Sequence, residues 1–383
     1  MKIIVLGAGL VGGPMAIDLA ADPMFDVTAV DVSPQAVGEL KSKHPGISVI
    51  EANLSDPATV TSVVKDYDLV LNAVPGFMGF ETLEAVVKAR KDVVDISFFP
   101  EDPFALDQLS RTMGVTAVVD CGVAPGLSNL LIGDVDARLD EIQSILIYVG
   151  GLPVIREWPC EYKAGFSPLD VIEEYTRPAR YVENGAMVTR VALSDPELVD
   201  FPGVGTLEAF NTDGLRTLAT TLDAPNMKEK TLRYTGHIDK MAFLRELGLF
   251  DKEEVRINGS TIRPIDVTAA LLFPKWKLED GEADLTVMQI IVEGTSDGNG
   301  VREVFHLLDK YDENSKTHSM ARTTGYTATV AARMLAQGLY SRPGISPPEL
   351  IGKHEECVAF MLAGLETRGI TLDHKIESIL RPL

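Results

Sequence analysis

The sequence feature that most constrains the fold is a glycine-rich loop near the N-terminus. Gly7-Ala8-Gly9-Leu10-Val11-Gly12 has the spacing G-x-G-x-x-G, follows the apolar run Lys2 to Leu6 and precedes a stretch with helical spacing. A strand that enters such a turn and leaves as a helix begins a βαβ unit. The first glycine permits the sharp bend, the second lets a pyrophosphate approach the backbone, and the third lets helix and strand pack closely. The loop therefore predicts a dinucleotide site.

Residues 1–124 continue this alternation of β-branched runs with helical stretches, which is typical of a parallel sheet covered on both faces. The pattern predicts a doubly wound α/β domain with a six-stranded sheet. The expected strands are Lys2–Leu6, Asp26–Asp31, Ile47–Ala52, Leu69–Val74, Asp92–Ile96 and Thr116–Val119. The expected helices are Gly13–Ala21, Pro34–Ser42, Pro57–Lys65, Gly79–Lys88 and Pro103–Met113.

After Asn129 the alternation stops, and segments such as Glu141–Val149 and Ala283–Glu293 have the pattern of antiparallel strands. This change predicts a second, α+β domain. The cluster Arg342–Pro348 predicts a linker to a final helix, Leu350–Thr367. We expect a nucleotide-binding domain at 1–124, a substrate-binding and dimerisation domain at 125–342, and a C-terminal helical segment at 343–383 that returns to the first domain.

Composition narrows the possible partners. The formal net charge of −21 disfavours nucleic acid, and it either attracts cationic substrates or only maintains solubility. No apolar run reaches the ~18 residues that a membrane span requires. Cys121, Cys160 and Cys357 stand far apart, which indicates neither a disulfide framework nor a zinc ribbon. We expect a cytoplasmic protein that binds no metal, membrane or nucleic acid.

Asp31 ends the second expected strand, roughly 20 residues after Gly12, where an acid can accept the ribose 2′-OH of a dinucleotide. Its carboxylate would repel the 2′-phosphate of NADP, and Val32 and Ser33 supply no arginine to compensate. The sequence therefore predicts NAD. Further cofactor contacts are expected in the loops after the later strands, although each loop could equally be an ordinary turn. These residues are Asn53, Leu54, Asp56, Ala73, Val74, Pro75, Ile96, Gly122 and Val123.

Polar residues at the carboxyl ends of strands are the candidates for chemistry, because ligands of open α/β sheets bind there. Asp95 could accept a proton or anchor an amine, or it could only cap a helix or bind a loop. His237 lies where a strand-like run gives way to a helix and could take a proton near neutral pH, or could be structural. Lys163 and Arg233 could hold a carboxylate and Glu208 an ammonium, or each could be solvated or salt-bridged.

The chain resembles the saccharopine dehydrogenase-like family. The more specific of the tracts that carry this resemblance are Gly150–Pro153 and Arg233–His237, although Thr235 stands where the resemblance leads us to expect proline. The resemblance implies a dinucleotide-binding domain and an α+β domain that pairs into a homodimer or homotetramer. The tracts are Gly7–Gly12, Asp120–Asn129, Gly150–Pro153, Glu161–Lys163, Val171–Tyr175, Glu208–Phe210 and Arg233–His237.

Within the family, the chain is most similar to the branch that oxidises the ε-amine of L-lysine with NAD. In that reaction hydride leaves C6, water attacks the imine, and ammonia departs to leave a semialdehyde, which cyclises. A free lysine amine has a pKa of ~10.4, so the reaction requires a base, for which His237 or Asp95 is available. The alternative activities are those of a saccharopine dehydrogenase, whose substrate would need a cluster of basic residues to bind its carboxylates, and of a carboxynorspermidine dehydrogenase. A non-catalytic NAD-binding assembly protein is the alternative of another class.

Overall fold

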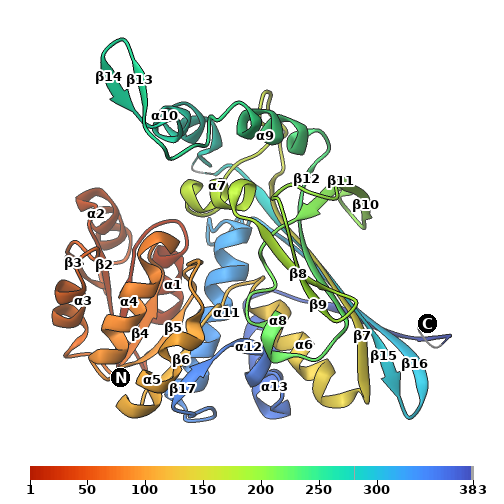
Figure 1. The fold of residues 1–383 in the computed structure, drawn as a ribbon. Coiled ribbons are helices and arrows are strands. Elements are labelled where there is room, and N and C mark those ends of the chain that lie inside the picture. Colours follow the sequence, from red (N-terminus) through yellow and green to blue (C-terminus); the bar gives the residue numbers. More distant parts are fainter. Residues whose placement is uncertain (280, 381–383) are drawn as a thin grey trace. The chain divides into compact units, whose positions relative to one another are not determined.

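The computed structural model describes residues 1–279 and 281–380 and divides the chain into two compact units (Figure 1). Unit 1 comprises Met1–Arg138 and Ala321–Thr371, and unit 2 comprises Leu139–Met320 and Leu372–Leu383. Residues 381–383 of the expected C-terminal segment lie outside the described residues. None of the helices in the described ranges is both long and apolar enough to cross a membrane.

Unit 1 contains a seven-stranded parallel sheet in the order β17-β6-β5-β4-β1-β2-β3. The order reverses between β1 and β4, so the sheet is doubly wound, as the sequence predicted. The strands are β1 (Lys2–Leu6), β2 (Asp26–Asp31), β3 (Ser48–Glu51), β4 (Leu69–Asn72), β5 (Asp92–Asp95), β6 (Thr116–Val118) and β17 (Gly344–Ser346).

The seventh strand corrects one expectation. Arg342–Pro348, predicted as a linker, contains β17, in which Ile345 pairs with Ala117 of β6 and is 2% exposed. A strand of three residues among prolines and a glycine carries too little periodicity to be recognised in the sequence.

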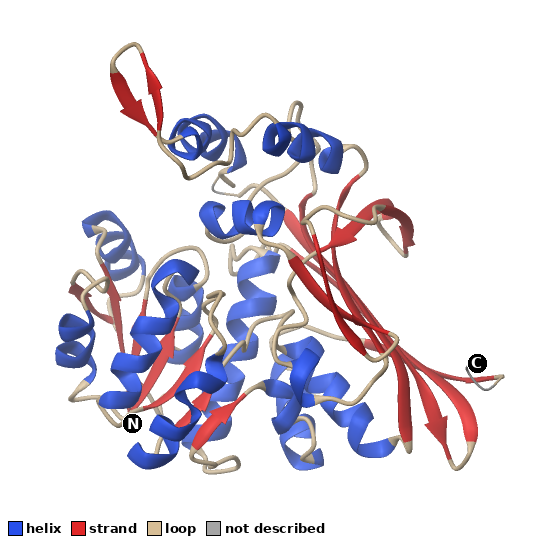
Figure 2. Ribbon diagram, in the orientation of Figure 1, coloured by secondary structure: helices blue, strands red, loops and turns tan. Residues whose placement is uncertain are grey.

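Helices cover this sheet, as Figure 2 shows in blue. Proline begins α2 and α3, where Ser33 and Asp56 accept hydrogen bonds from first-turn N–H groups and so end the preceding loops. The expected final helix is split in two at Gly352, where a side chain would meet the Leu130 carbonyl oxygen at 2.1 Å. The helices of unit 1 are α1 (Gly12–Ala20), α2 (Pro34–Lys43), α3 (Pro57–Val64), α4 (Gly76–Lys88), η1 (Pro103–Leu106), α5 (Asp107–Met113), α6 (Leu127–Arg138), α12 (Pro348–Ile351), α13 (Glu355–Glu366) and most of α11 (Ser319–Ala336).

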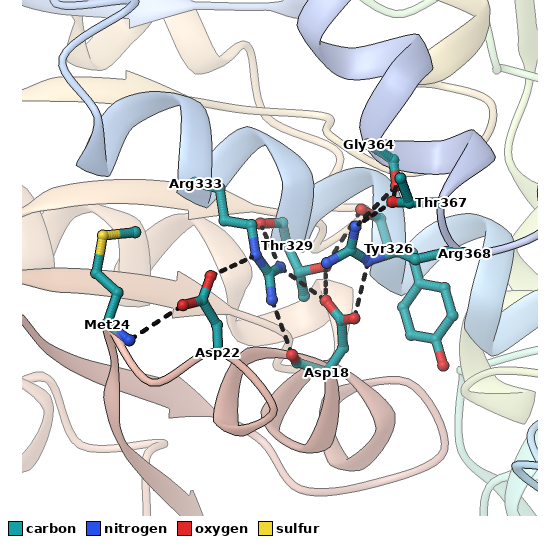
Figure 3. Close-up of polar contacts among 9 residues, drawn as sticks. All are labelled: Asp18, Asp22, Met24, Tyr326, Thr329, Arg333, Gly364, Thr367 and Arg368. Carbon is teal, nitrogen blue, oxygen red and sulfur yellow. Dashed lines mark hydrogen bonds and ion pairs between the residues drawn. The ribbon is translucent and has the colours of Figure 1, made fainter.

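A largely buried ion-pair cluster attaches the C-terminal helices to α1 (Figure 3). One carboxylate oxygen of Asp18 accepts hydrogen bonds from Thr329 Oγ1 at 2.5 Å and Arg333 Nη1 at 2.8 Å, and the other accepts one from Arg368 Nε at 2.8 Å. Asp22 lies 3.3 Å from Arg333 Nε. These contacts join residues more than 300 positions apart in the sequence. They help explain why residues 321–371 belong to unit 1.

Unit 2 is built on a mixed nine-stranded sheet in the order β10-β11-β12-β7-β15-β16-β18, with β8 and β9 paired beside β12. The prediction of antiparallel strands holds for β7 with β15, whereas β7 and β12 are parallel. The strands are β7 (Glu141–Pro153), β8 (Ala179–Glu183), β9 (Ala186–Arg190), β10 (Glu197–Phe201), β11 (Gly205–Asn211), β12 (Asn226–Tyr234), β15 (Asp284–Ser296), β16 (Asn299–Lys310) and β18 (Asp373–Ile379). A separate hairpin is formed by β13 (Val255–Ile257) and β14 (Ser260–Ile262).

The helices of unit 2 are α7 (Pro168–Thr176), α8 (Leu218–Thr221), α9 (His237–Glu246) and α10 (Pro264–Trp276). Of these, α7, α9 and α10 share a core centred on the fully buried Trp276 and Tyr175. This core lies beside the carboxyl end of β12, and it positions the polar residues described below.

The division by compactness differs from the expected boundaries at 124/125 and 342/343. It lies at 138/139 and 320/321, because α6 packs on α12 and α13. The C-terminal segment returns to unit 1 only as far as Thr371. Beyond that residue, β18 pairs with β16 of unit 2.

Candidate nucleotide and substrate sites

In unit 1, each of the three glycines of the loop after β1 is explained by a different structural feature. Gly7 has a φ of +96°, and a side chain there would approach the Ala73 carbonyl oxygen at 2.6 Å. A side chain at Gly12 would lie 2.0 Å from the Gly7 carbonyl oxygen. At Gly9 nothing lies within 4 Å of an added Cβ. Gly9 is therefore the position at which the loop backbone is open to a ligand.

The first helix begins directly after this loop. Its N-cap residue, Val11, makes no side-chain capping hydrogen bond, and Leu10 is 46% exposed. Free N–H groups at a helix start favour an anion such as a phosphate. The open backbone at Gly9 and the uncapped start of α1 together fit the pyrophosphate of a dinucleotide.

Asp31 connects this loop to the end of β2. Its two carboxylate oxygens accept hydrogen bonds from the N–H of Ala8 at 2.8 Å and the N–H of Ser33 at 2.9 Å. Each carboxylate oxygen can accept more than one hydrogen bond, so Asp31 can still receive a ribose hydroxyl. The neighbouring Val32 is 62% exposed and contributes no positive charge.

The expected adenine contacts have local structural roles. Asn53 Oδ1 accepts hydrogen bonds from the N–H and hydroxyl of Ser55, and Leu54 is buried. Asp56 caps α3, where hydrogen bonds from Thr59 and Ala58 lower the pKa of its carboxyl. These roles explain the residue types without a ligand, and their cofactor contacts stay predictions.

Two further predicted stretches extend the carboxyl edge of the sheet. The N–H of Ala73 binds the Leu6 carbonyl at 2.8 Å and that of Ile96 binds the Asn72 carbonyl at 3.0 Å, so both backbones continue the ladder beyond the strands. Val74 is buried, and Pro75 precedes α4 as its N-cap. All these residues belong to the edge at which nucleotides bind in such sheets.

The loop that contains Gly122 and Val123 is folded tightly upon itself. The Gly122 N–H binds the Pro125 carbonyl at 3.0 Å, across a cis bond between Ala124 and Pro125. Burial raises the pKa of the preceding Cys121 thiol to about 12, so this cysteine is a packed thiol and not a nucleophile.

Asp95 is fully buried at the end of β5. It accepts hydrogen bonds from Asn72 Nδ2 at 2.9 Å, from the Ser97 N–H at 2.7 Å and from the Ser97 hydroxyl. Burial raises the pKa of its carboxyl to about 7, against the effect of these hydrogen bonds, and the charge of Asp120 adds to the rise. Asp95 therefore holds a loop, as one of the two sequence interpretations expected, and its predicted catalytic role stays a prediction.

In unit 2, His237 is the first residue of α9 and is completely buried. Its Nδ1 lies 2.9 Å from the Cys160 carbonyl oxygen, which can only accept a hydrogen bond, so we place the imidazole proton on Nδ1. Nε2 then accepts the hydroxyl of Tyr175 at 3.0 Å. Arg233 Nε in turn donates to the Tyr175 oxygen at 3.2 Å. Four residues thus form one buried hydrogen-bonded chain.

Burial lowers the pKa of His237 to about 3, and the positive charge of Arg233 adds to this effect. The imidazole is therefore neutral at physiological pH, and both of its nitrogens are hydrogen-bonded within the protein. Nε2 can take a proton only when the Tyr175 hydroxyl releases it. The role of His237 as a base stays a prediction, and the structure shows that it would act through Tyr175.

The three predicted substrate residues have protein partners. Arg233 is 2% exposed and lies 2.5 Å from Glu174 Oε2, and Glu208 accepts the Gly236 N–H at 3.0 Å. Lys163 lies between Glu157 and Glu282, at 3.4 and 3.3 Å. Unit 2 therefore brings His237 and Arg233 together, while Glu208 lies opposite Arg233 on the adjacent β11.

Sequence reasoning did not assign roles to Tyr175 and Glu174, although it noted their tract. In the sequence Tyr175 is an apolar position of an amphipathic helix, and nothing there shows that its hydroxyl meets His237 and Arg233. In the described ranges, no group of three or more His, Cys, Asp or Glu side chains is arranged to hold a metal ion.

The switch-point sheet, the open glycine loop and the acid after β2 define a dinucleotide-binding protein of the doubly wound class. The family model of the saccharopine dehydrogenase NADP binding domain matches residues 3–118, and that of the saccharopine dehydrogenase C-terminal domain matches residues 122–370. The chain belongs to the saccharopine dehydrogenase family of oxidoreductases, which confirms the resemblance.

Relatives differ in how much of their length the chain spans. It is 27% identical over 267 residues to the mitochondrial alpha-aminoadipic semialdehyde synthase of Mus musculus, covering 66% of this chain but 29% of that protein. It is 23% identical to saccharopine dehydrogenase [NADP(+), L-glutamate-forming] of Saccharomyces cerevisiae, and the match covers 91% of this chain and 93% of that protein. Carboxyaminopropylagmatine dehydrogenase of Synechocystis is 21% identical, and the match covers 90% of this chain and 91% of that protein.

A solved structure shows the same fold. Apo saccharopine dehydrogenase (L-Glu forming) from Saccharomyces cerevisiae superimposes with a TM-score of 0.79 at 20% identity, covering 98% of this chain and 99% of that one. The predicted fold class, a doubly wound parallel sheet with an α+β domain, is confirmed.

Proposed function

We propose that this protein uses NAD to oxidise the carbon that bears the terminal amine of L-lysine, which is the activity of a lysine 6-dehydrogenase. The observation that carries the proposal is the charge pairing in unit 2. Arg233 faces Glu174, and Lys163 lies between two glutamates. Saccharopine brings more carboxylates than lysine and would need cations not already matched by acids. L-lysine brings only one carboxylate.

The chain's own residues would bind the nucleotide and manage protons. The start of α1 and the backbone at Gly9 would receive the pyrophosphate, and Asp31 the ribose 2′-OH. When bound, NAD supplies the hydride acceptor. The substrate ammonium must first lose a proton, and the Tyr175 hydroxyl could receive it while passing its own proton to His237 Nε2. Arg233, which donates to the same oxygen, would hold the hydroxyl in position for this transfer.

The preference for NAD rests on Asp31, because a carboxylate repels the 2′-phosphate and Val32 offers no counter-charge. The matched family model is described as NADP-binding, and the yeast relative is named for NADP(+). A calorimetric titration of the purified protein with each nucleotide decides the question. Equal or tighter binding of NADP would contradict the role given to Asp31.

The main test is a panel of amines assayed for NADH, with ammonia measured in the same samples. We expect L-lysine to yield both products in equal amounts between about pH 7 and about pH 10, the range in which the free amine becomes available. No NADH from folded, NAD-bound protein would reject the substrate. Turnover of saccharopine or carboxynorspermidine would then identify it, and no turnover of any amine would favour a non-catalytic NAD-binding protein.

A polyamine-type substrate is the second candidate. It is favoured by the similarity to a carboxyaminopropylagmatine dehydrogenase over 90% of the chain and by the net charge of −21. The same panel includes such amines, and a higher kcat/KM for them than for L-lysine would select this candidate.

The role of His237 is tested separately. If it accepts the proton, His237→Asn should lower kcat by ~100-fold or more while NAD affinity stays nearly unchanged. Tyr175→Phe should produce a similar loss, since the proton would pass through its hydroxyl. Loss of NAD binding, or a kcat close to that of the wild type in the folded variant, would identify His237 as purely structural.

We further propose that the protein is a homodimer or homotetramer, as the resemblance implies. Light scattering at micromolar concentration should give a multiple of the 41.5 kDa chain mass. A stable monomer would reject the proposal.

A further inference from the structure

A second polar cluster in unit 2 lies where the start of β8, just after α7, contacts the loop between β11 and α8. Arg180 donates three hydrogen bonds to the Asp213 carboxylate, from its backbone N–H at 3.2 Å, its Nε at 2.8 Å and its Nη2 at 2.7 Å. The Asp213 side chain is 5% exposed. This contact ties the two segments together at one point.

The loop itself is held against β12. The Thr212 hydroxyl donates to Glu229 and lies 2.9 Å from the hydroxyl of Thr231. A side chain at Gly214 would lie 2.3 Å from the Glu229 carboxyl group. The loop at Thr212 and Gly214 is therefore closely packed against β12, which fixes the backbone that leads to Arg216.

Two arginines converge beside the contact between Arg180 and Asp213. Arg177 precedes Arg180 by three positions and Arg216 follows Asp213 by three, and the positive charge of Arg216 helps burial to lower the pKa of Arg177. The side chain of Arg177 is 13% exposed, and Arg216 is 9% exposed. Like charges held together out of water are unfavourable, and the carboxylates of Glu173 and Asp213 offset part of this charge.

Thr217, the next residue along the chain, supplies the observation that points to a ligand. It is 4% exposed, and its hydroxyl has no hydrogen-bond partner. Buried hydroxyls are nearly always hydrogen-bonded, so the orphaned hydroxyl of Thr217, next to Arg216 in the chain, indicates a position for an acceptor. Arg216 also has a φ of +52°, a conformation that costs energy and is often found at binding sites.

We propose that Arg177, Arg216 and Thr217 bind the α-carboxylate of the amino-acid substrate, an inference that rests on the proposed function. Guanidinium groups match the planar carboxylate with paired hydrogen bonds, and the threonine hydroxyl donates to one of its oxygens. The carboxylates of Glu173, 3.9 Å from Arg177 Nη2, and of Asp213 limit the positive charge of the cluster. The site thus suits a group with a single negative charge better than a phosphate.

The test uses two probes that differ only in the carboxylate, L-norleucine and pentan-1-amine. Binding is measured by calorimetry on the protein loaded with NADH, which cannot accept a hydride from the terminal amine of pentan-1-amine. We expect L-norleucine to bind at least ~10-fold more tightly than pentan-1-amine, since charged hydrogen bonds typically contribute a factor of ~10 to 100. Arg216→Gln should weaken the binding of L-norleucine by that factor and leave the binding of pentan-1-amine unchanged.

Two further variants keep the result interpretable. Thr217→Val preserves the side-chain shape and should weaken the binding of L-norleucine by roughly 3- to 10-fold, the effect of one hydrogen bond. Arg256→Gln, on the exposed hairpin strand β13, removes an arginine elsewhere and should change the binding of neither probe. Thermal unfolding confirms that each variant is folded.

The outcomes separate this inference from the proposed function. Equal binding of the two probes by the wild-type protein, no binding of L-norleucine, or equal losses for both probes in folded Arg216→Gln would overturn the carboxylate site. An unchanged KM for L-lysine in that variant would also overturn it while the proposed activity stands. Binding of L-norleucine that depends on Arg216, together with no NADH from L-lysine, would support the site and reject the proposed reaction.

Discussion

Alanine variants of the glycine loop should distinguish the role of Gly9 in nucleotide binding from the role of Gly12 in folding. At Gly9 a methyl group would touch no protein atom within 4 Å, and the backbone there does not require the left-handed region. Gly9→Ala should therefore leave the fold as stable as before, or stabilise it by about 0.4–1 kcal/mol through the unfolded chain. The same methyl group would occupy the side that a pyrophosphate approaches. Loss of one charge-assisted backbone hydrogen bond, about 1.5–3 kcal/mol, would weaken NAD binding by ~10- to 100-fold.

At Gly12 the expected effect falls on folding. The added carbon would lie 2.0 Å from the Gly7 carbonyl oxygen, and since non-bonded contacts of a Cβ stay beyond about 3 Å, the loop would have to shift by roughly 1 Å. Overpacking of this kind costs about 1–3 kcal/mol. For a unit of this size each kcal/mol lowers Tm by about 2–4 °C, so Gly12→Ala should lower it by about 2–12 °C.

Gly13→Ala is the matched control, because it adds the same methyl group one residue further along α1. Its nearest neighbour would be the Ala8 carbonyl oxygen at 3.4 Å, which is ordinary contact, and alanine favours the helix. The assay is calorimetric unfolding with and without NAD, combined with titration of NAD. If Gly9→Ala bound NAD like the wild-type protein, or if Gly12→Ala unfolded at the same temperature as Gly13→Ala, the structural reasoning about the loop would be refuted.

Three other perturbations test separate parts of the structure. Asp31→Ser combined with Val32→Arg should shift the ratio of NAD to NADP affinity toward NADP, and an unchanged ratio in titrations would mean that Asp31 does not meet the ribose. Arg333→Ala leaves the largely buried Asp18 carboxylate paired with Arg368 but without the Arg333 cation, and should destabilise unit 1 by about 1.5–3 kcal/mol in urea unfolding; a loss below about 1 kcal/mol would show that the cluster in Figure 3 contributes little. The pKa of His237 is about 3 when folded but ~6.5 when unfolded, so its contribution to stability is present above about pH 6.5 and lost as the pH falls toward 3. His237→Gln should reduce this loss of stability in acid, and an identical pH dependence of wild type and variant would contradict the lowered pKa.

The nucleotide half of the protein could be predicted from the sequence because its signals are local. The spacing of Gly7 to Gly12, the strand before it and Asp31 at the end of β2 all lie within one βαβ unit. Strand alternation and proline at helix starts likewise depend on neighbouring residues. The expected strands β1 and β2 therefore match the structure at both ends.

The substrate half needed the tertiary structure, because its contacts join residues far apart in the chain. His237 meets Tyr175 across 62 positions and Cys160 across 77. The residue type of His237 suggested either a proton acceptor or a structural histidine, and only the packing around it shows that the imidazole is buried, neutral and linked to Arg233 through Tyr175.

The same distinction explains the division into units. No local pattern indicates that Arg333 and Arg368 would reach Asp18 on α1, or that β17 would extend a sheet whose other strands end at Val118. The sequence by itself determined the glycine loop, the acid after β2 and the α/β class, since backbone geometry and periodicity act over a few residues. Burial, ion pairing and shifted pKa values were decided only by the folded chain, because they depend on which distant side chains exclude water from one another.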